Sequence, residues 1–326
     1  MKAIRIALVG LAVACAMGVT LARAETALTL GIVLGRSSHY GVAATTLAEE
    51  MAKRSDGSFR VEIFSDGILG GEREIVVGTQ LGTVDIAIVS TGPVGNFVPA
   101  TLITDIPFLF RDYAHARTVL DGPIGQAILS EFPKHGLIAL AWGENGFRHI
   151  TTTTRPITKP EDLVGLKLRT MQNSVHMRAF TVLGAKPMPL PAPNIYAALQ
   201  SHIVEGQENP IPVILDLKFS EVQKYLALTG HVYSPAVIMV SPQLWERLDD
   251  SDRAMLKGSA IKAGAAMRAT VDHQEQEGLK TLRAAGMIVI DGIDKSAFQA
   301  ALAPAYAEYA KTFGQAQIDS IRDSHP

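Results

Sequence analysis

Residues 165–210 read GLKLRTMQNSVHMRAFTVLGAKPMPLPAPNIYAALQSHIVEGQENP, and this stretch is the most informative part of the chain. It predicts a strand that presents Arg169, an amphipathic helix, a proline-rich loop, a second helix, and a strand that ends in Gln207, Glu208 and Asn209. An extended backbone directs Gln207 and Asn209 to one face and Glu208 to the other. We therefore expect this stretch to build most of a carboxylate-binding site.

The first 24 residues predict a secretory signal sequence. A basic start with Lys2 and Arg5 precedes the uncharged apolar run 6–21, and Ala22-Arg23-Ala24 is a cleavage site of the A-x-A type. We expect cleavage after Ala24 and export to the periplasm. The alternative is a membrane anchor, but the run of roughly 16 apolar residues is shorter than the ~20 that span a bilayer.

Removal of this segment changes both the cysteine content and the net charge of the protein. The only cysteine, Cys15, lies within it, and lipoprotein cleavage before Cys15 would leave an unusually short apolar core. The rest of the chain then has no disulfides and depends on its hydrophobic core. Loss of three basic residues changes the formal charge from −2 to −5, which does not favour nucleic-acid binding. An exported protein of this kind is most often a binding protein or a hydrolase.

The remaining chain alternates short apolar runs with helical stretches, which is typical of an α/β fold. The strands predicted in its first part are 28–34, 59–64, 84–89 and 137–142, and the predicted helices are 41–54, 72–81, 111–120 and 124–132. The segment 142–163 predicts a crossover, and 237–240 predicts a strand that returns to the first lobe. We expect a two-lobed fold of the periplasmic-binding-protein type, with lobe I formed by 25–146 plus 235–274 and lobe II by 147–234 plus 275–326.

Residues 249–285 contain no proline and keep a helical apolar rhythm. A continuous helix of this length spans about 55 Å, so we expect it to connect both lobes, with a bend near Gly258 or Gly264. The alternative is two helices with a break. A last strand is predicted at 287–290 and closing helices at 295–311 and 315–321. Two lobes joined by several segments enclose a cleft that can close on a ligand.

Arg169 is the first candidate for ligand binding, because a planar guanidinium binds a carboxylate through two parallel donors. By spacing alone it could equally be a surface arginine. The amides of Gln207 and Asn209 suit a ligand that carries both carboxylate and hydroxyl groups, although the segment could also be an ordinary strand-to-helix turn. Arg148, in Asn145-Gly146-Phe147-Arg148, adds a second cation near the crossover, where a lone arginine more often supports a loop.

The motifs GLKLR, LGAKPMP, IYAALQ and VEGQENP follow one another in 165–210. Together with LGGERE at 69–74, IPFLF at 106–110 and NGFR at 145–148, they resemble the solute-binding proteins of TRAP transporters over nearly the whole chain after the signal. The resemblance implies a two-lobed periplasmic protein with a long connecting helix. Such a protein closes on an organic acid and delivers it to a membrane permease driven by an ion gradient.

By position, the resemblance makes Arg169 the main carboxylate-binding arginine, Arg148 an accessory arginine and Asn209 their amide partner. It also implies that Glu72 accepts a ligand hydroxyl and that Ser90 lines the cleft. His39, Tyr40 and Tyr233 are further candidate contacts, for which packing or capping is at least as good an explanation.

Relatives that bind sialic acid carry polar groups where this chain has Val33 and Ser90, and an aromatic residue near Ala192. These departures argue against sialic acid. We expect a small hydroxy or sugar acid, because Glu72, Ser90, Asn209 and His39 would offer several hydrogen-bonding groups to hydroxyls, although C4-dicarboxylates, 2-oxo acids and aromatic acids stay open. Two cationic side chains facing a closed cleft would repel each other, so we expect tight closure only around an anion.

The alternatives are a ligand-sensing protein of the same fold and an exported hydrolase. The sequence lacks G-x-S-x-G and H-E-x-x-H, and its nine histidines show no metal-ligand spacing, although His39, His149 and His231 could meet in a cleft. We expect no catalysis, no cofactor, no metal and a monomer.

Overall fold

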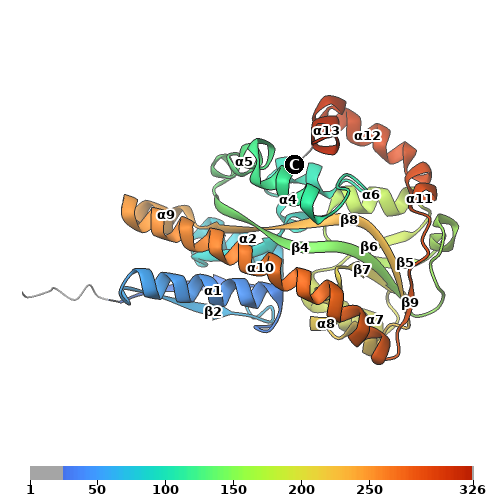
Figure 1. The fold of residues 1–326 in the computed structure, drawn as a ribbon, viewed down its shortest axis with the longest axis horizontal. Helices are drawn as coiled ribbons and strands as arrows, with labels where there is room; N and C mark the ends of the chain where they lie inside the picture. Colours follow the sequence, from blue (N-terminus) through green and yellow to red (C-terminus); the bar gives the residue numbers. More distant parts are fainter. Residues whose placement is uncertain (1–24, 325–326) are drawn as a thin grey trace, which may run out of the picture.

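The computed structural model describes residues 25–324, so the predicted signal sequence lies outside the described residues. Within the described range, no helix combines the length and apolar character needed to cross a membrane. The described strands form one mixed sheet in the order β2-β1-β3-β8-β4-β7-β5-β6, and β9 pairs with β8 (Figure 1). The strands are β1 Thr26–Gly31, β2 Phe59–Phe64, β3 Ile86–Ser90, β4 Ile138–Thr152, β5 Lys167–Thr170, β6 Lys186–Pro189, β7 Gly206–Asn209, β8 Tyr225–Val240 and β9 Ile288–Ile290.

Two long central strands, β4 and β8, join the two lobes. β3 pairs with β8 only at Ala236–Val240, and β7 pairs with β4 only at His149–Thr152, which lie toward opposite ends of the antiparallel β4–β8 ladder. The first lobe therefore contains β1, β2 and β3, and the second lobe contains β5, β6 and β7. The predicted crossover at 142–163 begins within β4, whose pairing with β8 keeps the backbone extended through Thr152.

The ladder is irregular where the lobes meet. Its register shifts between Glu144 and Gly146 and again between Arg148 and Ile150. Gly146 has φ +119°, a conformation that side chains disfavour, so glycine is required at this bend. The predicted lobe boundaries at 146/147 and 234/235 fall beside it and stay a prediction.

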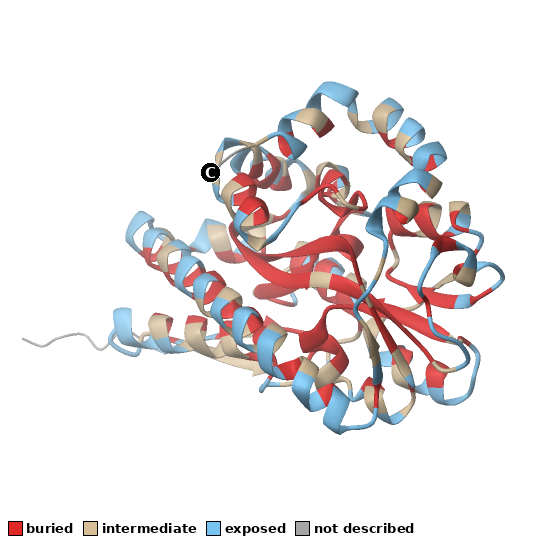
Figure 2. Cartoon of the chain, turned by 45° about the vertical axis from the view of Figure 1, so that its right-hand side comes forward, coloured by how far each residue is buried: buried red, intermediate tan, exposed pale blue. Residues whose placement is uncertain are grey.

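Helices cover both faces of the sheet, and the buried residues concentrate on the strands and on the inward faces of the helices (Figures 1 and 2). The α-helices are α1 His39–Arg54, α2 Glu72–Leu81, α3 Thr91–Val94, α4 Tyr113–Asp121, α5 Pro123–Leu129, α6 Ser174–Val182, α7 Ile195–Gln200, α8 Ile211–Asp216, α9 Pro242–Arg247, α10 Asp250–Ala284, α11 Lys295–Ala301, α12 Ala303–Phe313 and α13 Gln315–Arg322. Short 3₁₀ helices are η1 Pro99–Asp105, η2 Phe132–His135, η3 Pro160–Leu163, η4 Ala192–Asn194 and η5 Phe219–Glu221.

The long helix α10 is continuous over 35 residues, as predicted, and begins at the N-cap Asp249. It packs against α1 of the first lobe, crosses β4, and continues to α8 of the second lobe (Figure 1). Its glycines permit close packing: a Cβ at Gly264 would lie 2.4 Å from the Trp142 carbonyl oxygen, and one at Gly278 would lie 2.6 Å from Ile211.

The predicted closing helix 295–311 is wrong as a single element. It is divided into α11 and α12 at Leu302, and Pro304 occupies the first turn of α12. A proline within a longer helix would remove a backbone hydrogen bond and clash with the preceding turn, so the chain starts a new helix there.

Candidate ligand-binding site

A cavity lies between the lobes, at the carboxyl ends of their parallel strands. The first lobe contributes residues that follow β1 and the start of α2, and the second contributes residues at the ends of β5 and β7 and beyond β6. Ligands of open α/β sheets bind at this end of the strands. The cavity is small, about 20 Å³, and is lined by Val33, Leu34, Tyr40, Glu72, Asn145, Arg169, Met171, Ala192, Ile195, Asn209 and Val213.

Arg169 is held by one edge of its guanidinium. The side chain is 2% exposed, and its Nε and Nη2 donate to the Leu190 carbonyl oxygen at 2.9 and 2.5 Å. Within residues 25–324 no hydrogen bond is found for Nη1. Burial lowers the pKa of Arg169 to about 9, so the group is still a cation at neutral pH. Arg169 therefore offers an oriented, positively charged donor to the cavity.

Arg148 is completely buried and paired with Glu208. Its Nε donates to Glu208 Oε2 at 2.5 Å and its Nη2 to Oε1 at 2.9 Å, and Nη2 also donates to the Glu208 carbonyl oxygen. Burial alone would raise the pKa of Glu208, but Arg148 and a contact with His231 hold it well below its usual range. We expected two uncompensated arginines that repel each other. This expectation is wrong for Arg148, because Glu208 neutralises its charge inside the protein.

The end of β7 holds an ordered amide pair. Asn209 Nδ2 donates to Gln207 Oε1 at 2.5 Å, and Gln207 Nε2 donates to Thr151 Oγ1 at 2.8 Å. The two amides lie on one face, as strand alternation predicts. Arg148 Nη2 donates to Asn209 Oδ1 at 3.1 Å. Arg148 therefore orients Asn209, while Asn209 itself lines the cavity.

Glu72, the first residue of α2, brings a carboxylate to the same cavity. It is 7% exposed, and its Oε1 accepts the backbone N–H of Ser90 at 2.7 Å. Burial raises the pKa of Glu72, whereas the Ser90 hydrogen bond and the charges of Arg169 and Arg148 lower it. Such a carboxylate accepts a hydrogen bond from a ligand hydroxyl and disfavours a second carboxylate beside it.

His39 lies behind the cavity wall. Its Nε2 is 3.1 Å from Asn145 Oδ1, and its ring meets Tyr40 edge-on, with centroids 4.8 Å apart. Burial lowers the pKa of His39 to about 4, so the ring is neutral at pH 7. His39 therefore positions Asn145 and Tyr40, the two neighbours that line the cavity.

Tyr233, a predicted ligand contact, does not line the cavity. Tyr233 pairs with Phe147 in the β4–β8 ladder, one position from Arg148, so its side chain is on the opposite face. Its hydroxyl donates to Glu144 Oε2 at 2.9 Å, and its ring packs edge-on against Phe110 and Phe147.

The structure thus brings four of the predicted residues, Arg169, Asn209, Glu72 and Tyr40, to the cavity. Arg148 and Ser90 bind Asn209 and Glu72 from behind, and His39 lies behind Asn145 and Tyr40. The sequence did not indicate Asn145, which also lines the cavity. Asn145 belongs to the NGFR motif, but nothing in the sequence showed which residue of that motif faces the cavity.

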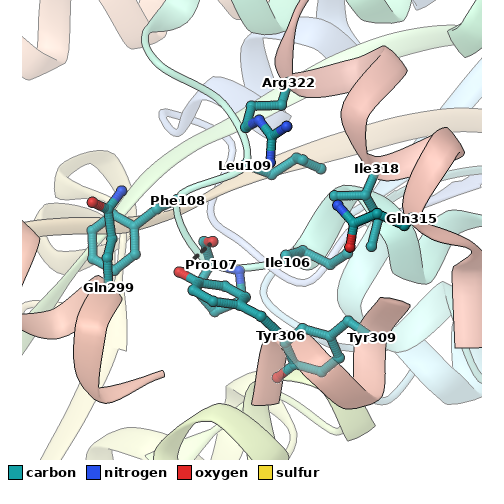
Figure 3. Close-up of a pocket in the computed structure, with 10 residues that line it drawn as sticks. All are labelled: Ile106, Pro107, Phe108, Leu109, Gln299, Tyr306, Tyr309, Gln315, Ile318 and Arg322. Carbon is teal, nitrogen blue, oxygen red and sulfur yellow. Dashed lines mark hydrogen bonds between the residues drawn. The ribbon is translucent and has the colours of Figure 1, made fainter. Parts of the chain in front are cut away.

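A second cavity, of about 260 Å³, lies away from this site, between the segment Ile106–Leu109 and the C-terminal helices α11, α12 and α13 (Figure 3). Most of its lining is apolar or aromatic. Arg322 is turned toward Asp319 and Asp323, with which it forms ion pairs. Tyr306 Oη donates to the Pro107 carbonyl oxygen at 3.2 Å. Because this arginine is already paired with carboxylates, the interlobe cavity is the better anion site.

Within the described part of the chain, no group of three or more histidine, cysteine, aspartate or glutamate side chains is arranged to hold a metal ion. The interlobe cavity combines one cationic fork, one carboxylate, two amides and a phenol with apolar walls. This arrangement can bind a small anion that also carries hydroxyl groups.

The chain is similar to known proteins over most of its length. A solute-binding protein of Verminephrobacter eiseniae is 47% identical over 303 residues, which cover 93% of this chain and 90% of that protein. A TRAP periplasmic solute-binding protein from Polaromonas sp. JS666, solved with bound D-erythronate, is 49% identical with a TM-score of 0.91. One from Bordetella bronchiseptica, with density interpreted as pantoate, is 48% identical with a TM-score of 0.91. Each alignment covers 93% of this chain and 100% of the solved chain.

Residues 30–312 match the family described as bacterial extracellular solute-binding protein, family 7. With the two-lobed fold, the long helix and the interlobe cavity, this match identifies the chain as a member of that family, the solute-binding proteins of TRAP transporters.

Proposed function

We propose that this protein captures a compact hydroxy acid or sugar acid between its lobes and delivers it to the membrane permease of a TRAP transporter. The observation that carries the proposal is the Arg169 guanidinium, which is buried, fixed by Leu190, and lines the same cavity as Asn209 and Glu72. A carboxylate on Arg169 would form a charge-assisted pair in a site from which water is largely excluded.

The other side chains support a ligand with hydroxyl groups next to its carboxylate. Glu72 accepts a hydroxyl hydrogen, and Asn209 and Asn145 can donate or accept. The D-erythronate and pantoate of the two solved relatives are both short acids with a hydroxyl beside the carboxylate.

We further propose that the protein acts in the periplasm as a monomer, after cleavage at Ala24, and without catalysis. The state of His39 supports binding over hydrolysis. With a pKa of about 4 and its Nε2 bonded to Asn145, this histidine is a poor general base at neutral pH.

A thermal-shift screen tests the ligand class. D-Erythronate, pantoate, D-galactonate, succinate and the neutral sugars erythritol and glucose are compared at equal concentration. A true ligand at 100 times its dissociation constant adds about 2.7 kcal/mol to the free energy of unfolding. We expect short hydroxy acids to raise Tm most. Stabilisation by neutral sugars with none by acids would contradict the role of Arg169.

Uptake by cells tests delivery. Deletion of the neighbouring permease genes should abolish uptake of the radiolabelled acid, and restoring the genes should return it. Unchanged uptake in the deletion strain would refute the transport role and favour a ligand-sensing protein with the same cleft.

A further inference from the structure

The two lobes also touch through residues that do not line the cavity. We call these contacts the cleft rim, which consists of the pairs Gly35–Asp216, Asn96–Gln172, Gly71–Pro191 and Gly67–Pro193. At one point the Gly35 N–H of the first lobe donates to Asp216 Oδ2 of the second lobe at 3.0 Å. At another, Asn96 Nδ2 of the first lobe donates to the Gln172 carbonyl oxygen of the second at 2.7 Å. None of these four residues lines the cavity. The rim therefore contributes to lobe contact independently of the ligand site.

In addition to these polar contacts, two glycines of the first lobe meet two prolines of the second. A Cβ placed on Gly71 would lie 2.9 Å from Pro191 Cβ, and one on Gly67 would lie 2.7 Å from Pro193 Cγ. Both distances are shorter than van der Waals contact, so the present spacing of the lobes requires these positions to have no side chain. The proline ring fixes φ, which limits how far the opposite loop can yield.

Gly71 is the more informative of the two, because its backbone does not itself demand glycine. Gly71 has φ −76° and ψ −179°, which any residue adopts, whereas Gly67 has φ +66°. Within its own lobe a Cβ on Gly71 would meet only Glu74 Oε2, at 2.8 Å, the end of a flexible side chain. The obstacle that cannot simply rotate away is Pro191, across the rim.

We propose that Gly71 determines ligand affinity without touching the ligand, because its missing side chain lets the first lobe seat on Pro191 when the cleft closes. The inference rests on the proposed function, in which the acid is held between closed lobes. Gly71 immediately precedes Glu72. The same turn therefore contacts Pro191 across the cleft rim and presents the Glu72 carboxylate to the cavity. If only the closed state binds tightly, a smaller closed fraction raises the apparent Kd in proportion.

The test variant is Gly71→Ala, with D-erythronate and pantoate as probes. Gly71 is also the N-cap of α2, where alanine is a poor residue, so Gly71→Ser serves as a second variant that restores capping and still fills the rim. Gly292→Ala is the matched control, because a Cβ there meets nothing within 4 Å. We expect both Gly71 variants to weaken binding at least tenfold through faster dissociation, and Gly292→Ala to bind like the wild type.

A second experiment measures, by cross-linking and in the absence of ligand, how closely the two lobes approach each other at the cleft rim. Residues 25–326 contain no cysteine, so Asn96→Cys and Gln172→Cys introduce a single pair of thiols across the rim. A short bismaleimide should link them efficiently in the parent protein and in Gly292→Ala, and at least threefold less efficiently in Gly71→Ala and Gly71→Ser.

The outcomes separate the two proposals. Equal cross-linking and equal affinity in Gly71→Ala, Gly71→Ser and Gly292→Ala would overturn the role of Gly71 while leaving the proposed ligand class intact. If the wild type binds none of the acids but both Gly71 variants still lose cross-linking, the rim role stands and the proposed function fails.

Discussion

Arg148 and Glu208 form a completely buried, two-point ion pair, with Nε 2.5 Å from Oε2 and Nη2 2.9 Å from Oε1. The pair joins β4 to β7 and lies directly behind Asn209, which accepts a further hydrogen bond from Arg148. Because Glu208 compensates Arg148, the charge available to a ligand is that of Arg169.

Glu208→Gln should strongly destabilise the protein. The amide keeps the shape of the side chain but leaves Arg148 as an uncompensated buried charge, for which a loss of about 3–5 kcal/mol is typical. Urea unfolding followed by circular dichroism measures the change, with the exposed Glu277→Gln as control. A loss below about 1 kcal/mol in Glu208→Gln would show that the pair is not essential to the fold.

Arg169→Ala should leave the fold intact and weaken acid binding by at least about 2 kcal/mol, because it removes a charge-assisted donor from a buried site. Arg169→Lys should also bind weakly, since one ammonium group cannot reproduce the planar fork that bonds Leu190 and a carboxylate together. Isothermal titration with D-erythronate measures both, and the exposed Arg283→Ala is the control. Near-native affinity in Arg169→Ala would remove this residue from the site.

Glu72→Gln should change ligand preference. The amide can still accept the Ser90 N–H but no longer repels a second negative charge. We expect weaker binding of D-erythronate, whose hydroxyl loses an anionic acceptor, and stronger binding of the dicarboxylate succinate. The ratio of the two dissociation constants is the readout, and an unchanged ratio would mean that Glu72 does not face the ligand.

Burial of His39 as a neutral ring should make the free energy of unfolding decrease at acidic pH. Its pKa is about 4 in the folded protein and about 6.5 when unfolded, so below pH 6.5 the unfolded chain takes up the proton first. The stabilisation is complete above pH 6.5 and is lost as the pH falls toward 4, by about 2 kcal/mol between pH 7 and pH 5.

The measurement is the difference in unfolding free energy between the wild type and His39→Gln across this range. The difference is needed because the buried carboxyls of Glu72 and Glu275, whose pKa values burial raises, act in the opposite direction. A flat difference curve would show that His39 is not buried as a neutral ring.

Tyr233→Phe should leave acid affinity unchanged, since the ring lies on the face of β8 away from the cavity. The variant removes the hydrogen bond to Glu144 and should cost about 1 kcal/mol of stability. Arg117 still binds Glu144 through two nitrogens, which limits the loss. A large loss of affinity with unchanged stability would return Tyr233 to the ligand site.

The sequence by itself determined the elements whose signals are local. The apolar rhythm of 249–285 predicted the continuous helix α10, and the alternation in β7 predicted that Gln207 and Asn209 share a face. The guanidinium of Arg169 could be proposed as a carboxylate receptor from its chemistry and its place at a strand end. These inferences depend on neighbours close in the chain, so sequence was enough.

Only the tertiary structure decided which charges are compensated and which side chains reach the cavity. Arg148 and Glu208 are 60 residues apart, and pairing between β4 and β7 makes them one buried ion pair. The same long-range packing set Gly71 against Pro191 and turned Tyr233 away from the ligand. Strand register and lobe contact fix these relationships, and neither is encoded in any short stretch of residues.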